Sequence, residues 1–350
     1  MTTSPRRPAR AALVALVPVT LCGCPSDAPP AAGPAPVAPR DPAATGPLVV
    51  YSGRGEGLVG PLLKRFEQER GVALSIRYGG TPELASQLAS EGASSPADVI
   101  FAQDSGYLGA LARLGLLEAL PATLLERVDP RFRDPEGRWL GTSARARVLV
   151  YATGAIRPDE LPDALADLAH PRWKGKLGWA PGNASFQAHV SYLRHAWGEE
   201  RTRAWLVAVQ ANEPTVYAKN GQIVEGVLTG DVQVGWVNHY YLHRREEGAP
   251  AANYSFRAPK DAGNVLMVSG VAVRAGSPRA AQARELIEFL AGEAAQRHFA
   301  QETFEYPAVP GVPTHPRVPA LDALGLADVD QAHLADVGPT LKLLQELGLQ

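Results

Sequence analysis

Short apolar runs alternate with amphipathic stretches from residue 48 onward. The run LVVYS is followed by a stretch whose apolar positions recur at spacings of three and four residues, which predicts a helix that ends at Gly71. These apolar positions are Leu58, Val59, Leu62, Leu63 and Phe66. A second run, VALSIRY, precedes TPELASQLASEG, in which Thr81 suits a helix N-cap and Pro82 suits the first turn. PADVIFAQD adds a third apolar strand, and this alternation predicts an α/β sheet with parallel strands.

The same pattern returns in the second half of the chain. WKGKLGWAPGNASFQAHVSYLRHAWG predicts strand, loop and helix, and TVYAKNGQIVEGVLTGDVQVGWVNHYY predicts strand, helix and strand; RAAQARELIEFLAG and DQAHLADVGPTLKLLQELG add helices at the end. Two β-rich segments, at residues 143–153 and 264–276, are placed to cross between the halves. We therefore predict two discontinuous α/β lobes joined by two hinge strands. The predicted N-lobe comprises residues 47–143 plus about 268–305, and the predicted C-lobe comprises residues 144–267 plus about 306–350.

The N-terminal residues have the pattern of an export signal. Arginines without acidic residues are followed by the short apolar run AALVALVPVTLCGC, which predicts a signal peptide at residues 1–23. The segment LCGC resembles a bacterial lipobox, which implies a lipid on the sulfur of Cys24; a plain secretory peptide is the alternative. Residues 24–46 are rich in Pro and Ala, which predicts an extended tether. We expect a protein of the periplasm or cell surface that is lipid-anchored to a membrane.

Composition narrows the chemistry of the folded part. Both cysteines lie in the signal region, so the folded part has no disulfide, thiolate metal site or cysteine nucleophile, and any metal site there must use oxygen and nitrogen ligands. The formal net charge is −2, and removal of residues 1–23 leaves 31 basic and 36 acidic residues, which argues against a nucleic-acid partner. The sequence also contains no nucleophile elbow, P-loop, dinucleotide fingerprint or HExxH motif, which argues against an enzyme.

The candidate site centres on the stretch WVNHYYLHRREEG. A predicted buried strand that contains Trp236 ends at Asn238, and Tyr240 and Tyr241 then open the next helix. In α/β sheets, ligands bind beyond the carboxyl ends of the strands. At a helix start that faces a cleft two phenols can converge, and phenolates are good ligands for a hard trivalent cation such as Fe(III). Ordinary aromatic packing is the alternative for an isolated pair of tyrosines.

Eight stretches, in this order and spacing, carry a resemblance to a known family: VVYSGR, FEQERG, EGASSPADVIFAQD, WKGKLGWA, VYAKNGQIVEGVLTGDV, NHYYLHRREEG, VSGVAVRAGSP and EYP. The chain resembles, over nearly all of residues 48–350, the periplasmic ferric-ion-binding proteins of ABC iron importers, which have the type 2 periplasmic binding protein fold. The resemblance implies that the protein captures Fe(III) with a synergistic anion such as carbonate or phosphate by lobe closure. It also implies delivery to an ABC transporter permease in the inner membrane by a monomer that is not an enzyme.

The resemblance assigns roles to individual residues. Tyr240 and Tyr241 would be the metal ligands. The anion-binding residues would be Asn183, Ala184, Ser185, Asn220, Asn238 and Arg145. Turn or cap roles for the asparagines outside the strand, and an inter-lobe salt bridge for the arginine, are the alternatives. His239 and His243 flank the tyrosines without a third evident ligand, so we expect core or surface histidines there.

Two positions depart from the family pattern. Gly55 and Gln103 stand where many members carry a histidine and a glutamate ligand. Gln103 and Glu56 are candidates for a metal or outer-shell role, with a solvated helix-start carboxylate as the alternative for Glu56. Because two phenolates leave one positive charge on Fe(III), fewer protein ligands make an anion more necessary. The alternatives are a changed specificity, for a phosphonate or another small anionic or organic ligand, and an iron site that is completed by waters or several carbonates.

Overall fold

The computed structural model describes residues 46–349. The predicted signal peptide at 1–23, Cys24 and all but the last residue of the predicted tether at 24–46 lie outside the described residues. Those three assignments therefore stay predictions.

A mixed sheet runs through the described chain. Its strands are β1 (Leu48–Ser52), β2 (Leu74–Tyr78), β3 (Val99–Ala102), β4 (Leu140–Ala152), β5 (Leu177–Trp179), β6 (Thr215–Val216), β7 (Val234–Asn238), β8 (Ala251–Tyr254), β9 (Leu266–Val273) and β10 (Tyr306–Pro307). Their order is β2-β1-β3-β9-β4-β7-β5-β6, and β8 and β10 pair with β4. β1 is parallel to β2 and β3, and β5 is parallel to β6 and β7, which confirms the parallel pattern at both ends of the sheet.

Helices connect these strands and cover the sheet. They are α1 (Glu56–Arg70), α2 (Thr81–Glu91), α3 (Ser105–Arg113), α4 (Ala122–Leu125), α5 (Ala184–Trp197), α6 (Glu199–Ala211), α7 (Asn220–Thr229), α8 (Tyr240–His243), α9 (Ala280–Leu290), α10 (Glu293–Gln301), α11 (Gln331–Leu334) and α12 (Val337–Glu346). None of the helices within residues 46–349 is long and apolar enough to cross a membrane.

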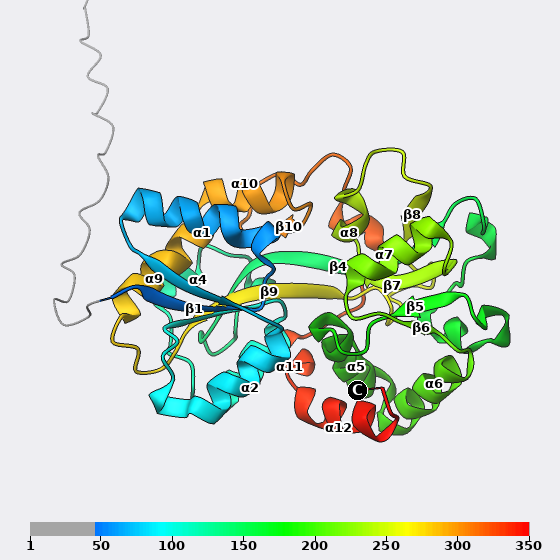
Figure 1. The fold of residues 1–350 in the computed structure, drawn as a ribbon, viewed down its shortest axis with the longest axis horizontal. Coiled ribbons are helices and arrows are strands. Elements are labelled where there is room, and N and C mark those ends of the chain that lie inside the picture. Colours follow the sequence, from blue (N-terminus) through cyan, green and yellow to red (C-terminus); the bar gives the residue numbers. More distant parts are fainter. Residues whose placement is uncertain (1–45, 350) are drawn as a thin grey trace, which may run out of the picture. The chain divides into compact units, whose positions relative to one another are not determined.

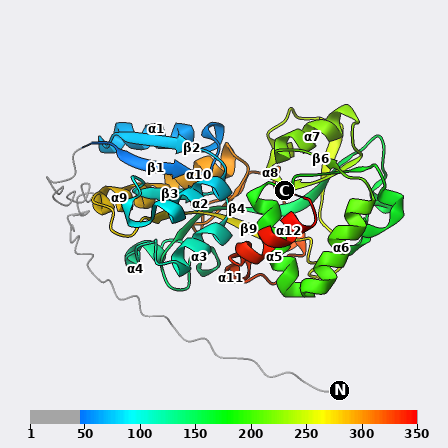
Figure 2. The same ribbon diagram turned by 60° about the horizontal axis from the view of Figure 1, so that its bottom comes forward.

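Two α/β lobes share the sheet. Strands β1 to β3 with α1, α2 and α9 form one lobe, and β5 to β7 with α5, α6 and α7 form the other (Figure 1). The long strands β4 and β9 run between them, as Figure 2 also shows, and β9 pairs antiparallel with both β3 and β4. These are the two hinge strands that the sequence predicts. The predicted lobe boundaries at 143/144 and about 267/268 fall within β4 and β9, the one at about 305/306 falls at the start of β10, and all of them stay predictions.

Burial explains why the strands are so apolar. Every residue of β3 and of β9 is buried, as expected for strands that are covered on both faces. The apolar positions predicted for the first helix are the buried residues of α1. Gly71 ends this helix with a φ of 62°, in the left-handed region that glycine adopts without strain.

Two local predictions were wrong. The N-cap of α2 is Gly80, and Thr81 is the first helical residue; the Thr81 hydroxyl instead accepts a hydrogen bond from the backbone N–H of Gln103 at 2.9 Å. A Cβ at Gly53 would lie 1.9 Å from this hydroxyl, so only glycine allows the turn after β1 to approach α2 so closely. The helix predicted over DQAHLADVGPTLKLLQELG is two helices, α11 and α12, because Asp336 between them has a non-helical ψ of 53°.

Candidate metal site

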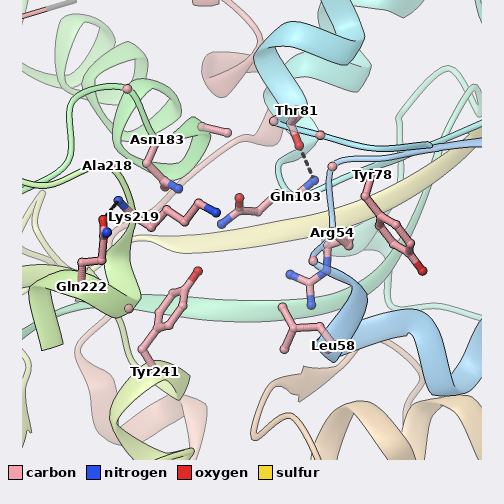
Figure 3. A pocket seen from close by; sticks show the side chains of 18 of the residues that line it. Arg54, Leu58, Tyr78, Thr81, Gln103, Asn183, Ala218, Lys219, Gln222 and Tyr241 are labelled. Atoms are coloured by element: carbon pink, nitrogen blue, oxygen red, sulfur yellow. Dashed lines mark hydrogen bonds between the residues drawn. The ribbon is translucent and has the colours of Figure 1, made fainter. Parts of the chain in front are cut away.

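A cleft of about 1000 Å³ opens between the two lobes. On one wall it is lined by the turns that follow β1 and β2 and by Gln103, which follows β3. On the other wall it is lined by the starts of α5 and α7 and by α8 (Figure 3). Strand ends and helix starts therefore surround the cleft, which is where α/β sheets bind ligands.

Tyr240 and Tyr241 lie together on the C-lobe wall. Strand β7 delivers the chain to this point, and the two rings stack with centroids 4.3 Å apart and planes inclined by 26°. Tyr240 is fully buried, and its hydroxyl has no hydrogen-bond partner among residues 46–349. Burial, followed by the neighbouring Tyr241, raises the pKa of Tyr240 well above its ordinary range, while Arg54 and Arg145 act in the opposite direction. A cation that binds here must therefore displace a phenol proton.

Arg54 approaches the tyrosines from the N-lobe. It follows β1, is buried, and its Nη2 lies 2.5 Å from Oε2 of Glu305, which is also buried. Nε and Nη1 of the same guanidinium have no partner within residues 46–349. Burial works against the charged form, but Glu305 and the two tyrosines outweigh it and raise the pKa of Arg54. One edge of this guanidinium is therefore occupied by Glu305, and the other edge has donors to spare.

Arg145 sits behind the cleft on hinge strand β4. Its Nη2 donates to Oδ2 of Asp104 at 3.2 Å and to Oγ of Ser185 at 3.3 Å, and all three side chains are buried. Asp104 also caps α3 by accepting from the N–H of Gly106. Burial raises the pKa of Asp104 to about 6 although Arg145 opposes the shift. Arg145 thus makes the buried inter-lobe ion pair that the sequence left as an alternative, and it also reaches the predicted anion loop.

Arg147 lies two residues further along β4, on the same face of the strand. Its Nη1 donates to Oδ1 of Asn238 at 3.0 Å and its Nη2 to the carbonyl oxygen of Trp236 at 3.1 Å. The guanidinium lies over the ring of Trp236, 5.0 Å from its centroid, and no carboxylate pairs with it in the described part of the chain. Burial, with Arg145 next in importance, lowers the pKa of Arg147 to about 9, so it is charged at neutral pH. Of the three buried arginines at this site, Arg54, Arg145 and Arg147, only Arg147 forms no ion pair with a carboxylate within residues 46–349.

The predicted anion-binding residues form one hydrogen-bonded group at the starts of α5 and α7. Asn183 caps α5 by accepting from the N–H of Ser185 at 3.0 Å, and it also accepts from Nδ2 of Asn220 at 3.4 Å. Oγ of Ser185 accepts from Nδ2 of Asn238 at 3.3 Å. Asn183 and Ala184 line the cleft, whereas Ser185, Asn220, Asn238 and Arg145 are not among its lining residues. Oδ1 of the buried Asn220 has no partner among residues 46–349.

The N-lobe wall contains the positions that depart from the family pattern. Gly55 lines the cleft, and a Cβ there would meet no atom within 4 Å. Its φ of −61° suits any residue, so neither space nor backbone requires glycine. Gln103 lines the cleft and donates from Nε2 to Oγ of Ser185 across the lobes at 3.5 Å. Glu56 is exposed on the first turn of α1 and does not line the cleft.

The histidines beside the tyrosines are engaged elsewhere. Nδ1 of His239 accepts from the N–H of Ala146 at 3.1 Å, and its Nε2 donates to the carbonyl oxygen of Phe304 at 2.8 Å. Burial lowers the pKa of His239 to about 3 and that of His243 to about 4. No group of three or more His, Cys, Asp or Glu within residues 46–349 is placed to hold a metal ion. A metal in this cleft would therefore depend on the phenol oxygens and on external ligands.

Three cations of the site were not predicted from the sequence: Arg54, Arg147 and Lys219. Each had a signal in the sequence. Arg54 follows a parallel strand directly, at the edge where such sheets bind ligands. Arg147 stands two residues after Arg145 in a largely apolar strand, a spacing that puts both arginines on one face. Lys219 precedes Asn220 at the start of a predicted helix and lines the cleft.

Comparison with known proteins agrees with this geometry. The chain belongs to the family of bacterial extracellular solute-binding proteins, whose family model matches residues 94–324. This is a family of solute-binding proteins and not an enzyme family. The predicted type 2 periplasmic binding protein fold is confirmed by the solved structures that this chain resembles.

Particular relatives are iron-binding proteins. The chain is 34% identical over 308 residues to the Fe(3+)-binding periplasmic protein of Serratia marcescens, which covers 86% of this chain and 90% of that protein. The structure of iron-bound HitA from Pseudomonas aeruginosa matches with a TM-score of 0.81 and 31% identity, over 86% of this chain and 99% of that one. A Trichodesmium protein (IdiA, FutA) in complex with iron and citrate matches with a TM-score of 0.72 and 26% identity, over 87% of this chain and 100% of that one.

Proposed function

We propose that this protein is an extracytoplasmic solute-binding protein that holds Fe(III) as cargo in the cleft between its lobes. The observation that carries the proposal is the stacked pair Tyr240 and Tyr241, with a buried hydroxyl that no residue in 46–349 satisfies. A buried polar group without a partner is costly in a structure that serves only packing. The similarity to the ferric-binding proteins of Serratia marcescens and Pseudomonas aeruginosa supports the same ligand.

The two phenols act as metal ligands after losing their protons. A trivalent cation favours phenolate strongly because its own charge is the largest in the site. Arg54 and Arg145 help, since both lower the pKa of Tyr240 against the effect of burial. Gln103 is a candidate for the metal or its outer shell because it faces the same cleft. Glu56 has weaker support because it is exposed and outside the lining.

A synergistic anion such as carbonate or phosphate completes the site. The group formed by Asn183, Ala184, Ser185, Asn220 and Asn238 places two helix starts and several polar side chains at one edge of the cleft. Helix starts present N–H groups and a positive dipole end to anions. Arg145 adds charge directly behind Ser185, at 3.3 Å from its hydroxyl.

Capture and release follow from the two-lobe design. The lobes close on the ion and its anion by bending at β4 and β9, and the closed form delivers the ion to an ABC transporter permease in the inner membrane. No catalytic step is part of this function. Export to the periplasm or cell surface and lipid attachment at Cys24 would keep the protein near that permease, and it would act as a monomer.

The test is a visible absorption titration of the purified protein with Fe(III), with and without carbonate or phosphate. We expect a phenolate-to-iron charge-transfer band that needs the anion. The band should disappear in the variant that combines Tyr240→Phe with Tyr241→Phe. Tyr192→Phe is the matched control, because Tyr192 is buried on α5 and does not line the cleft. If no band forms with any anion, the ferric assignment is wrong.

A second candidate function is binding of a phosphonate or another small anionic or organic ligand without iron. The observation that favours it is the basic character of the lining, which contains Arg54, Lys219, Arg244 and Arg245 but only two acidic residues. In that case the titration with iron would give no band, while a small anion alone would raise the melting temperature, and the rise would grow with the logarithm of the anion concentration above its Kd.

A further inference from the structure

Helix α3 of the N-lobe lies unusually close to α11, a short helix near the end of the chain. Gly106 and Gly109 are three residues apart and therefore lie on one face of α3. A Cβ at Gly106 would lie 2.3 Å from the carbonyl oxygen of Leu334, and a Cβ at Gly109 would lie 2.7 Å from the Cβ of Ala335. The two glycines therefore let the backbone of α3 pack directly on the end of α11.

Hydrogen bonds hold both ends of α3 to the same segment. Oγ of Ser105, the first residue of α3, donates to Oε1 of Gln331 at 2.7 Å. The guanidinium of Arg113, the last residue of α3, donates to the carbonyl oxygen of Ala335. Helix α3 itself packs on α2 and β3 within the N-lobe. The contact with α11 therefore extends from the first to the last residue of this N-lobe helix.

The segment that α3 contacts is anchored in the C-lobe. Leu334 is fully buried in the apolar core to which α5, α6 and β7 of the C-lobe also contribute. The carbonyl oxygen of Asp336 accepts from Oγ of Ser191 at 3.3 Å and from Nη1 of Arg194 at 3.2 Å, and both donors are on α5. Figure 2 shows α11 between α3 and α5. The contact between α3 and α11 is therefore a contact between the lobes.

The same conformation brings the lobes together beside the cleft. Nε2 of Gln103 donates to Oγ of Ser185 across the lobes at 3.5 Å, and the hydroxyl of Tyr107 on α3 donates to Oε1 of Gln187 on α5. Gln187 in turn donates from Nε2 to the carbonyl oxygen of Pro181 at 3.2 Å, in the loop that leads to the predicted anion-binding residues. None of the residues that join α3 to α11 lines the cleft itself.

We propose that the contact between α3 and α11 is a latch that stabilises the closed arrangement of the lobes and so sets the affinity for the cargo from outside the cleft. When the lobes move about β4 and β9, α3 moves with one lobe and α11 with the other, so the contact changes with the motion. Weakening a contact made in the closed arrangement lowers the population of that arrangement, and the apparent affinity for the cargo falls by the same factor. This inference rests on the proposed capture of Fe(III) by lobe closure and adds a contact that regulates it.

The test adds one methyl group to the latch in the full chain. Gly109→Ala places a Cβ 2.7 Å from that of Ala335, closer than carbon atoms pack, so α3 must shift away from α11. We expect the Kd for Fe(III) with carbonate, measured at the phenolate band in competition with EDTA, to rise about tenfold. The wavelength of the band at saturation should stay the same, because no lining residue changes.

Gly338→Ala is the matched control. Gly338 is exposed on α12, and a Cβ there would meet no atom within 4 Å. The substitution makes the same change of residue within a helix, with the same gain in helix propensity, and should leave the Kd unchanged.

Two further variants show whether the effect arises at this contact. Adding Ala335→Gly to Gly109→Ala removes the methyl group that the new Cβ meets, so it should restore most of the affinity. Arg113→Gln removes the hydrogen bond to Ala335 from an exposed position and should raise the Kd about threefold; it carries the test if Gly109→Ala does not fold.

The outcomes separate the latch from the ferric function. An unchanged or lower Kd in Gly109→Ala or in Arg113→Gln would overturn the latch and leave the ferric function standing. The same holds if Ala335→Gly does not restore the affinity that Gly109→Ala loses. Absence of the phenolate band in the wild-type protein would overturn both.

Discussion

Replacing Tyr240 with phenylalanine is expected to stabilise the iron-free protein while it abolishes iron binding. The ring of Tyr240 is fully buried and stacks on Tyr241, and phenylalanine keeps both contacts. The substitution removes only a hydroxyl that has no partner among residues 46–349. If Tyr240 is retained for metal binding at a cost to stability, its replacement by phenylalanine should raise stability and remove iron binding.

The magnitude follows from the state of that hydroxyl. A buried polar group without a hydrogen bond costs about 1–3 kcal/mol, and removing it recovers most of this. We therefore expect Tyr240→Phe to raise the free energy of unfolding by about 1–2 kcal/mol. In a chain of this size such a change corresponds to a rise in melting temperature of about 2–6 °C.

Urea unfolding of chelator-treated protein, followed by circular dichroism, measures the change. Two variants serve as controls. Tyr306→Phe removes a buried hydroxyl that donates to the carbonyl oxygen of Pro319 at 2.7 Å, so it should destabilise by about 1 kcal/mol. Tyr241→Phe affects a partly exposed ring and should change stability by less than about 0.5 kcal/mol.

A clear loss of stability in iron-free Tyr240→Phe would contradict this reasoning. It would mean that the hydroxyl is satisfied in solution, for instance by an ordered water, and that its burial carries no information about a ligand. The unfolding measurement uses iron-free protein and is independent of the absorption titration. It therefore tests whether the Tyr240 hydroxyl is unsatisfied, whatever the titration with iron shows.

Three further predictions concern the surroundings of the site. Arg54→Gln should destabilise by about 3–5 kcal/mol because Glu305 stays charged in a buried position, and adding Glu305→Gln should recover most of the loss, as measured by urea unfolding. Burial lowers the pKa of His189 to about 3 in the folded protein. Below about pH 6.5 the imidazole of His189 therefore binds a proton in the unfolded chain but not in the folded protein. The contribution of His189 to the free energy of unfolding is full above that pH and falls by up to about 1.4 kcal/mol per pH unit as the pH drops. His189→Gln should flatten this slope in unfolding curves recorded between about pH 7 and pH 5, and an unchanged slope would refute the assignment. Gly55→His should fold with a change below about 0.5 kcal/mol, because a Cβ there meets no atom within 4 Å, and it should make iron binding less dependent on the anion in the absorption titration.

The fold was predictable because its signals are local. The period of three to four residues in α1 and the apolar runs of β1, β3 and β9 each identify one element without reference to any other. The error at Thr81 arose where a tertiary contact decided the outcome. Thr81 could have capped its helix, but its hydroxyl accepts from the N–H of Gln103, the residue after β3, and this contact leaves no trace in the local sequence.

The site was predictable only in part, for the same reason. Tyr240 and Tyr241 are adjacent in sequence and follow a strand, so their position is a local property. The role of Arg54 depends on Glu305, which lies 251 residues away, and that of Arg145 depends on Asp104 and Ser185 from two other elements. Contacts between residues so far apart in the sequence can be identified only once the fold is known. Even so, Arg145 and Arg147 at alternate positions of a largely apolar strand already indicated a buried charged site.

The buried charges behind the tyrosines indicate which anion the site requires. Arg54 is neutralised by Glu305 and Arg145 by Asp104, whereas Arg147 has no carboxylate partner in the described chain, so one positive charge remains. Fe(III) bound to two phenolates adds a second. Because an uncompensated buried charge is costly, the occupied cleft is stable only with an external ligand of about two negative charges or more. In the proposed ferric site, carbonate would meet this minimum.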